Sequence, residues 1–141
     1  MRGCDRVGQA DRQIEIDAGP DAVWSVVSDF GGLDSWMPGV DSCTLSDERT
    51  RVLSMLGMEV TEALSISDDA ARRLTYSIVK APFAFDQHQA TITVTPVSGN
   101  RACVTWSVDI RPDELTDMFA GVYGQALDAL KVRIDGTTPP A

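Results

Sequence analysis

The chain has 141 residues, 43% of them hydrophobic, and a formal net charge of −9. This length fits one ordinary domain, and the hydrophobic content allows a core to form without disulfide or metal support. A strongly acidic chain repels phosphate backbones, so we expect no nucleic-acid partner. No stretch approaches the roughly 20 apolar residues that cross a bilayer, and the N-terminus lacks a secretory signal, so we expect no membrane insertion.

Cysteine and histidine usage limits the chemistry further. The three cysteines, Cys4, Cys43 and Cys103, are odd in number and widely spaced, which argues against a disulfide framework and favours a cytoplasmic setting. With one histidine in the chain, we predict no protein-held metal. The absence of a Gly-rich phosphate loop and of HExxH and GxSxG motifs predicts no cofactor, no metalloprotease chemistry and no serine-hydrolase chemistry.

Both ends of the chain are polar and aperiodic. We predict flexible tails at residues 1–11 and 135–141, with one domain at residues 12–134 between them. Alternating apolar residues predict a first strand over Arg12–Ala18.

Two short helices are predicted after this strand. Pro20 suits the first position of a helix and Asp21 lies near the positive end of the helix dipole, so a helix begins here and runs through Val27. Gly31-Gly32 interrupts it, and a further helical turn carries Leu33–Trp36.

From residue 40 to residue 110 the pattern is strand after strand with short polar turns, which is typical of an antiparallel meander. The predicted strands are Val40–Leu45, Arg51–Leu56, Met58–Ile66, Arg73–Lys80, Asp86–Thr95 and Ala102–Ile110. A final amphipathic helix begins within Pro112–Thr116 and ends near Ile134. About 20 helical residues span about 30 Å, so the long sheet has to curl around this helix, which predicts an α+β fold.

Period-two alternation assigns the inner face of the sheet. In the third of these strands the predicted inner residues are Met58, Val60, Glu62, Leu64 and Ile66, which brings one carboxylate inside. The same reasoning places Tyr76, His88 and Trp106 on the inner face. Arg51 stays open. It points inward if Leu53 and Met55 do, and outward in the other register.

The residues also carry a family resemblance. The stretch 22–33, followed by Trp36-Met37-Pro38-Gly39-Val40, resembles the N-terminal signature of polyketide cyclase/dehydrase-like proteins of the START/Bet v 1-like helix-grip superfamily. Further matches are Arg51, Glu62-Ala63-Leu64, Asp68-Asp69, Tyr76-Ser77-Ile78, Ala81-Pro82 and Val104-Thr105-Trp106, so the resemblance covers about residues 12–134.

This resemblance implies a helix-grip fold, in which a curved antiparallel sheet of about seven strands wraps around the long C-terminal helix and encloses a cavity. Relatives bind lipids, hormones or polyketides in that cavity, and some catalyse cyclisation, aromatisation or dehydration without a cofactor. Arg51, Glu62 and Tyr76 match the pattern of the subgroup, whereas His88 stands where relatives often carry an aromatic residue.

Four polar residues are the candidates for catalysis, each with a structural alternative. Glu62 can transfer a proton at a carbon next to a carbonyl, or pair with Arg51 on the adjacent strand. His88 can act as a general acid or base near neutral pH, or be a satisfied core histidine. Tyr76 can donate to an enolate oxygen, which Arg51 can also stabilise, or it can fill the core.

The candidate substrate-binding residues are Trp24, Trp36, Met55, Met58, Phe83, Phe85, Trp106, Met118 and Val122. Tryptophans can wall a flat ligand, although Trp24 and Trp36 can equally lock the short helices onto the sheet. Phe83 and Phe85 follow Pro82 in a predicted loop and can gate an entrance.

We therefore expect a cofactor-free cyclase or dehydratase that acts on a small hydrophobic, carbonyl-bearing or polyketide-like substrate, as a monomer or homodimer. One alternative is a non-catalytic carrier or sensor of a hydrophobic small molecule, which uses the same cavity without an acid or base. Another is a partner-binding module, which would have little cavity volume.

Overall fold

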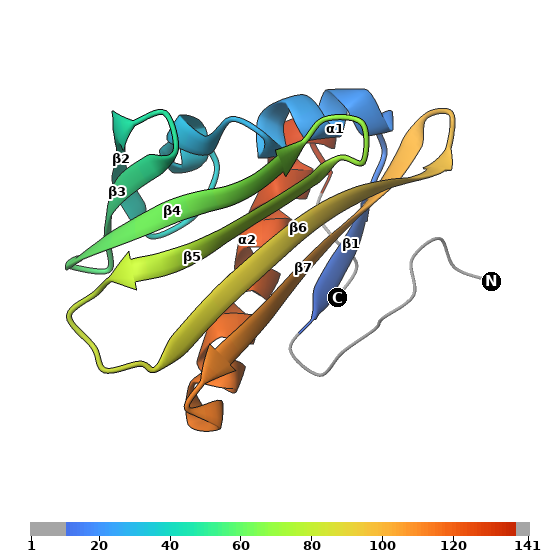
Figure 1. Ribbon diagram of the computed structural model, residues 1–141. Helices are drawn as coiled ribbons and strands as arrows, with labels where there is room; N and C mark the ends of the chain where they lie inside the picture. Colours follow the sequence, from blue (N-terminus) through green and yellow to red (C-terminus); the bar gives the residue numbers. More distant parts are fainter. Residues whose placement is uncertain (1–10, 138–141) are drawn as a thin grey trace.

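A computed structural model describes residues 11–137 of the chain. Seven strands form one antiparallel sheet in the order β1-β7-β6-β5-β4-β3-β2 (Figure 1). They are β1 (Arg12–Ile16), β2 (Val40–Asp47), β3 (Thr50–Met55), β4 (Met58–Asp68), β5 (Arg73–Lys80), β6 (Gln87–Ser98) and β7 (Arg101–Arg111). The sheet is curved but not closed, because β1 and β2 are its two free edges.

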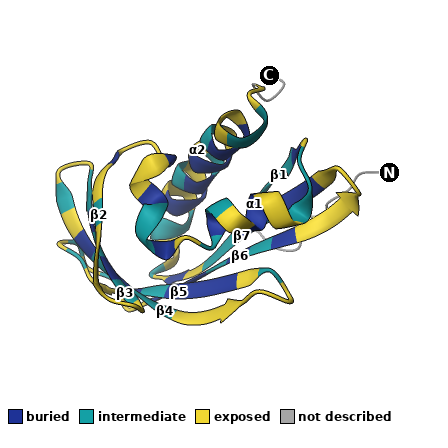
Figure 2. Cartoon of the chain, turned by 90° about the horizontal axis from the view of Figure 1, so that it is seen from above, coloured by how far each residue is buried: buried dark blue, intermediate teal, exposed yellow. Residues whose placement is uncertain are grey.

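The helices gather on one side of the sheet. They are α1 (Pro20–Val27), the 3-10 helices η1 (Phe30–Ser35) and η2 (Asp113–Leu115), and the long α2 (Thr116–Asp135). Figure 2 shows that α2 lies on the concave side of the sheet, with α1 on the same side. The predicted α+β helix-grip fold is thereby confirmed.

The predicted alternation holds along β5, β6 and β7, where the inward side chains are buried apart from the half-buried Val108. In β3 the structure decides between the two registers that the sequence left open. Arg51 and Leu53 point inward, since they are 3% and 1% exposed. The alternation fails at the end of β4, where Ile66 is 47% exposed instead of inward. A register shift between Leu64 and Ile66 explains the error, because an extra residue in a β-bulge reverses the alternation beyond it.

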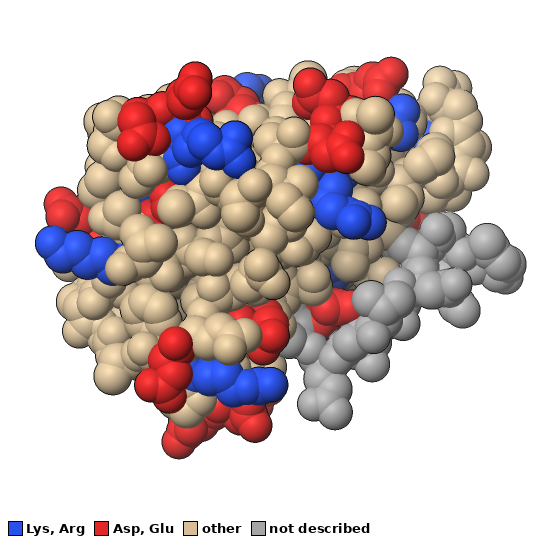
Figure 3. All heavy atoms as spheres, in the orientation of Figure 1, with Lys and Arg blue, Asp and Glu red and all other residues tan. Residues whose placement is uncertain are grey.

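The outer face of the sheet is visible in Figure 3. Charged side chains of both signs gather toward its margins, while uncharged residues occupy most of its middle. Thr75 on β5 and Thr91 on β6 join their hydroxyls there at 3.0 Å. Both threonines alternate with inward side chains of their strands, which leaves the inner face as the place for chemistry.

Several predictions concern the chain ends and the cysteines. Residues 1–10 and 138–141 of the predicted tails lie outside the described residues. Cys43 carries a free thiol, whereas Cys103 is disulfide-bonded, so the cysteine spacing, which argued against a disulfide framework, did not exclude a single disulfide. Spacing along the chain does not decide which sulfurs meet after folding. Within residues 11–137, no helix is both long and apolar enough to cross a membrane.

The hairpin between β3 and β4 carries backbone strain. Both residues of its turn have left-handed φ values, 52° at Leu56 and 77° at Gly57. Such a turn suits asparagine followed by glycine, whereas a bulky residue at positive φ is disfavoured. Replacing Leu56, which is 65% exposed, with asparagine should therefore raise the free energy of unfolding.

We expect a gain of about 0.5–1 kcal/mol for Leu56→Asn and a rise in Tm of about 2–4 °C. Calorimetry measures both. The matched control is Ile66→Asn, an exposed apolar residue whose φ is not positive, which should bring no gain. A lower Tm for Leu56→Asn than for the unaltered protein would contradict the strain.

Candidate active site

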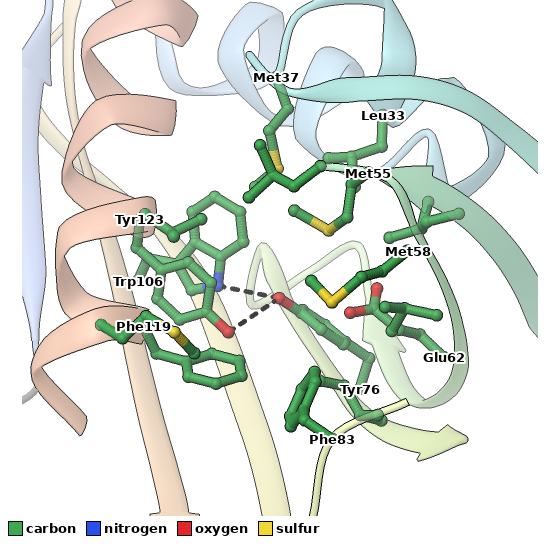
Figure 4. Close-up of a pocket in the computed structure, with 16 residues that line it drawn as sticks. Leu33, Met37, Met55, Met58, Glu62, Tyr76, Phe83, Trp106, Phe119 and Tyr123 are labelled. Atoms are coloured by element: carbon green, nitrogen blue, oxygen red, sulfur yellow. Dashed lines mark hydrogen bonds between the residues drawn. The ribbon is translucent and has the colours of Figure 1, made fainter. Parts of the chain in front are cut away.

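A cavity lies between the concave face of the sheet, η1 and α2. It offers about 110 Å³ to the centre of a water-sized sphere, whereas a single water needs only about 10–15 Å³ on this measure. Most of its wall is aliphatic, aromatic or thioether, and the polar atoms come from Glu62, Tyr76, Trp106 and Tyr123. In Figure 4 the hydroxyls of Tyr76 and Tyr123 and the carboxyl of Glu62 point into this space.

Most residues predicted from the sequence meet at this cavity. Those that line it are Met55, Met58, Glu62, Tyr76, Phe83, Trp106, Met118 and Val122. Arg51 and His88 are buried behind the wall, each in contact with a lining residue.

Three predicted substrate-binding residues do not line the cavity. Trp24 donates from Nε1 to Asp69 Oδ1 at 2.9 Å, and so ties α1 to the β4–β5 turn. Trp36 packs on Trp106, with ring centroids 6.1 Å apart. Phe85 packs on Phe83 at 5.8 Å. These three residues therefore pack within the fold and do not contact a ligand in the cavity. For Trp24 and Trp36 this corresponds to the structural alternative, in which they lock the short helices onto the sheet.

Sequence reasoning missed Tyr123, a central polar group of the site. It lies four residues after Phe119 and four before Leu127, on the buried stripe of α2. The helical spacing alone places Tyr123 on this buried face. Tyr123 stacks on Trp106, with centroids 4.2 Å apart and planes at 7°.

Arg51 and Glu62 form a buried ion pair across β3 and β4, where they are direct partners in the register. Arg51 Nε and Nη2 both donate to Glu62 Oε1, at 2.8 and 2.7 Å. Its Nη1 donates to the Phe30 carbonyl at 3.0 Å, and its guanidinium lies 4.0 Å from the centre of the Phe30 ring. Three of the five N–H groups of Arg51 are thus bonded to Glu62 and to the Phe30 carbonyl, and the buried guanidinium packs on the Phe30 ring.

The second carboxylate oxygen of Glu62 is differently placed. Within residues 11–137, no hydrogen bond reaches Oε2, although the side chain lines the cavity. Burial raises the pKa of the Glu62 carboxyl, and the Arg51 guanidinium opposes that rise. Glu62 therefore offers the cavity one oxygen that can accept a proton.

Two tyrosine hydroxyls meet at the same cavity, that of Tyr76 from β5 and that of Tyr123 from α2. They lie 3.4 Å apart, and Trp106 Nε1 donates to Tyr76 Oη at 3.2 Å (Figure 4). Burial is the first cause that raises the pKa of both Tyr76 and Tyr123 above the usual range. Both hydroxyls consequently keep their protons at neutral pH and act as donors.

His88 lies behind the cavity wall and contacts the Tyr123 hydroxyl. Its Nδ1 accepts the Ile78 N–H at 3.0 Å, so the ring proton of the neutral form is on Nε2, 3.3 Å from Tyr123 Oη. Burial lowers the pKa of His88 to about 4. The imidazole is therefore neutral at neutral pH, and both of its nitrogens are occupied.

The family follows from comparison with known proteins. No curated protein matches the sequence. The profile of the polyketide cyclase/dehydrase and lipid transport family matches residues 8–135, which is nearly the whole chain. The chain belongs to this family. The resemblance predicted from the sequence is confirmed.

Solved structures share the fold of this cyclase/dehydrase family member. XoxI from Bacillus cereus is 31% identical, covers 88% of this chain and 93% of its own, and has a TM-score of 0.83. A START superfamily protein from Mycobacterium smegmatis is 17% identical, with coverage of 89% and 96% and a TM-score of 0.73.

Norcoclaurine synthase from Thalictrum flavum, in complex with dopamine and hydroxybenzaldehyde, is 15% identical, with coverage of 92% and 87% and a TM-score of 0.71. At such low identity, this neighbour and the Mycobacterium smegmatis protein show the shared fold alone.

The buried imidazole predicts how the stability of this family member depends on pH. Unfolded histidine binds a proton below about pH 6.5, whereas His88 in the folded state does so only below a pKa of about 4. Acidification between these values therefore favours the unfolded state, by at most about 3 kcal/mol.

His88→Asn keeps an oxygen for the Ile78 N–H but cannot titrate. Urea denaturation from pH 7 to pH 4 should show the unaltered protein losing more stability than the variant, by up to about 3 kcal/mol. Other titrating groups, including Glu62, are common to both proteins. Parallel curves would show that His88 is not buried in its neutral form.

Proposed function

We propose that this protein is a cofactor-free acid/base catalyst of the cyclase or dehydratase type, acting on a small, largely apolar substrate that bears a carbonyl. The observation that carries the proposal is the shared cavity, where a carboxylate oxygen of Glu62 and the hydroxyls of Tyr76 and Tyr123 face one apolar space. The family description supports the reaction class. A structural neighbour, norcoclaurine synthase, is in complex with hydroxybenzaldehyde, which supports a carbonyl compound as the ligand.

The proposed chemistry starts with the substrate carbonyl oxygen against a tyrosine hydroxyl. Glu62 removes a proton from the carbon next to the carbonyl, and the electron pair of the C–H bond forms the enolate. The tyrosine hydroxyl stabilises the charge on the enolate oxygen. In dehydration the enolate then expels a β-hydroxyl group, which takes the proton from Glu62 and leaves as water. In cyclisation the enolate carbon attacks a second carbonyl of the same substrate, and Glu62 returns the proton to the alkoxide.

The two residues behind the wall have supporting roles in this proposal. Arg51 favours the ionised form of Glu62 and orients it through Oε1. His88 orients the Tyr123 hydroxyl, which is closer to the satisfied core histidine than to the general acid or base, the two roles that the sequence left open. The apolar walls fold a flexible substrate so that its reacting carbons approach each other.

Solvent exchange tests the proposed acid/base activity without knowledge of the natural substrate. The probe is 2-acetylnaphthalene in D₂O, whose methyl protons exchange only through an enol or enolate. NMR should show loss of the methyl signal at least about 100-fold faster with folded protein than with buffer alone, as positioned general-base catalysis predicts. A rate equal to that of the thermally unfolded protein would refute the proposal.

The carrier hypothesis remains the second candidate, because most of the cavity wall is apolar and the family description includes lipid transport. Binding of the ketone without any exchange would favour it. The cavity volume of about 110 Å³ argues against the partner-binding module, which predicts little internal space.

A further inference from the structure

In the hydrogen-bond network around the two tyrosines, the donor protons outnumber the hydrogen bonds that join the groups. Four groups can donate, namely Trp106 Nε1, His88 Nε2 and the hydroxyls of Tyr76 and Tyr123. Three contacts join them, and each uses one proton. The other nitrogen of His88 cannot absorb a proton from the network, because it already accepts the Ile78 N–H.

One hydroxyl proton is therefore left over. The N–H of Trp106 occupies Tyr76 Oη, and the N–H of His88 occupies Tyr123 Oη. Only one hydroxyl can donate to the other, so whichever accepts that bond keeps its own proton without an acceptor in the network. No hydrogen bond joins either hydroxyl to Glu62 in the described part of the chain. Both tyrosines line the cavity, so the natural acceptor is an oxygen of a bound ligand.

The charges around the cavity indicate whether the ligand oxygen is neutral or belongs to an anion. No lysine, arginine or histidine is among the lining residues within the described ranges. The nearby cation, Arg51, has its guanidinium bonded to Glu62 and to the Phe30 carbonyl. A ligand carboxylate would thus be desolvated beside the Glu62 carboxylate with no free cation, which is costly.

We infer that the cavity selects uncharged ligands with a hydrogen-bond-accepting oxygen, ketones and aldehydes in particular, over carboxylates of the same shape. This inference names the substrate class of the proposed activity and rests on that proposal only for the position of the ligand in this cavity. It separates the protein from a binder of fatty-acid anions, which needs a cation in the pocket.

Three probes of one shape test the inference on the unaltered protein by calorimetric titration at pH 7.5. They are 2-acetylnaphthalene, 2-naphthoate and 2-ethylnaphthalene, which present a neutral carbonyl, an anion and a hydrocarbon. We expect the ketone to bind about tenfold more tightly than the hydrocarbon, as one net hydrogen bond allows. It should bind at least about 100-fold more tightly than the carboxylate. Equal binding of the three, tighter binding of 2-naphthoate, or no binding of the ketone would overturn the inference.

Variants test the proton count itself. Tyr76→Phe and Tyr123→Phe each leave one hydroxyl whose proton has no tyrosine partner, so each should keep the preference for the ketone over the hydrocarbon within about threefold. The double variant has no hydroxyl and should bind ketone and hydrocarbon alike. If only one of the two single variants lost the preference for the ketone, the claim that either hydroxyl can supply the spare proton would be overturned. The three-probe comparison decides the inference if the double variant does not fold.

The two claims can fail separately. Selective ketone binding without methyl exchange would leave the ligand class standing and remove the catalytic proposal. Methyl exchange without selectivity between 2-acetylnaphthalene and 2-naphthoate would do the reverse.

Discussion

Replacing Arg51 with methionine is expected to lower the free energy of unfolding by about 3–5 kcal/mol at pH 8, because the Glu62 carboxylate then stays buried without a cation. Glu62 is 6% exposed, and Arg51 supplies both hydrogen bonds to its Oε1. Removal of Arg51 should raise the pKa of Glu62 further above that of the unfolded chain. The loss should therefore be smaller at pH 5, where the carboxyl can stay protonated in the fold, and grow as pH rises through the folded pKa.

Urea denaturation of the single and double variants at both pH values measures this effect. Arg51→Met combined with Glu62→Leu removes the charge as well as its partner, so stability should return to within about 2 kcal/mol of the unaltered protein. A double variant no more stable than Arg51→Met, or a single variant that loses less than about 1 kcal/mol, would show that the pair is not desolvated as described.

Replacing Glu62 with glutamine is expected to lower the rate of methyl exchange in 2-acetylnaphthalene by about 10²–10⁴-fold, the range of a positioned general base. Glutamine has nearly the same shape but cannot take the proton. The dissociation constant of the ketone should change by less than about tenfold, because the tyrosines hold its oxygen.

The matched control is Glu59→Gln, which removes an exposed carboxylate from the same strand. It should leave the exchange rate unchanged. Circular dichroism and Tm establish that both variants fold. Equal exchange by the Glu62→Gln variant and the unaltered protein would assign the proton transfer to some other group.

Local pattern was enough to predict the order of the elements and most of the inner face, because alternation and helical spacing are local properties of the chain. Alternation correctly places Glu62 on the inner face. It wrongly places Ile66 there, because the bulge before Ile66 arises from pairing with β5 and cannot be detected in the alternation of β4. Arg51 stayed ambiguous for the same kind of reason, because both registers of β3 bury apolar residues.

The candidate site was less predictable than the fold. The position of Tyr123 could be derived from helical spacing, but its contact with Tyr76 joins residues 47 positions apart. The role of His88 depends on the Ile78 N–H, a backbone group on the neighbouring strand that fixes the tautomer. Which ring nitrogen carries a proton cannot be predicted from residue types alone.

A crystal structure of the protein with bound 2-acetylnaphthalene tests most directly whether the cavity is a carbonyl site. We predict the ketone inside the cavity, with its oxygen within about 3.2 Å of Tyr76 Oη or Tyr123 Oη and its methyl carbon facing Glu62. A ketone bound outside the cavity, or inside it with the oxygen directed away from both hydroxyls, would contradict the ligand class and the catalytic roles together.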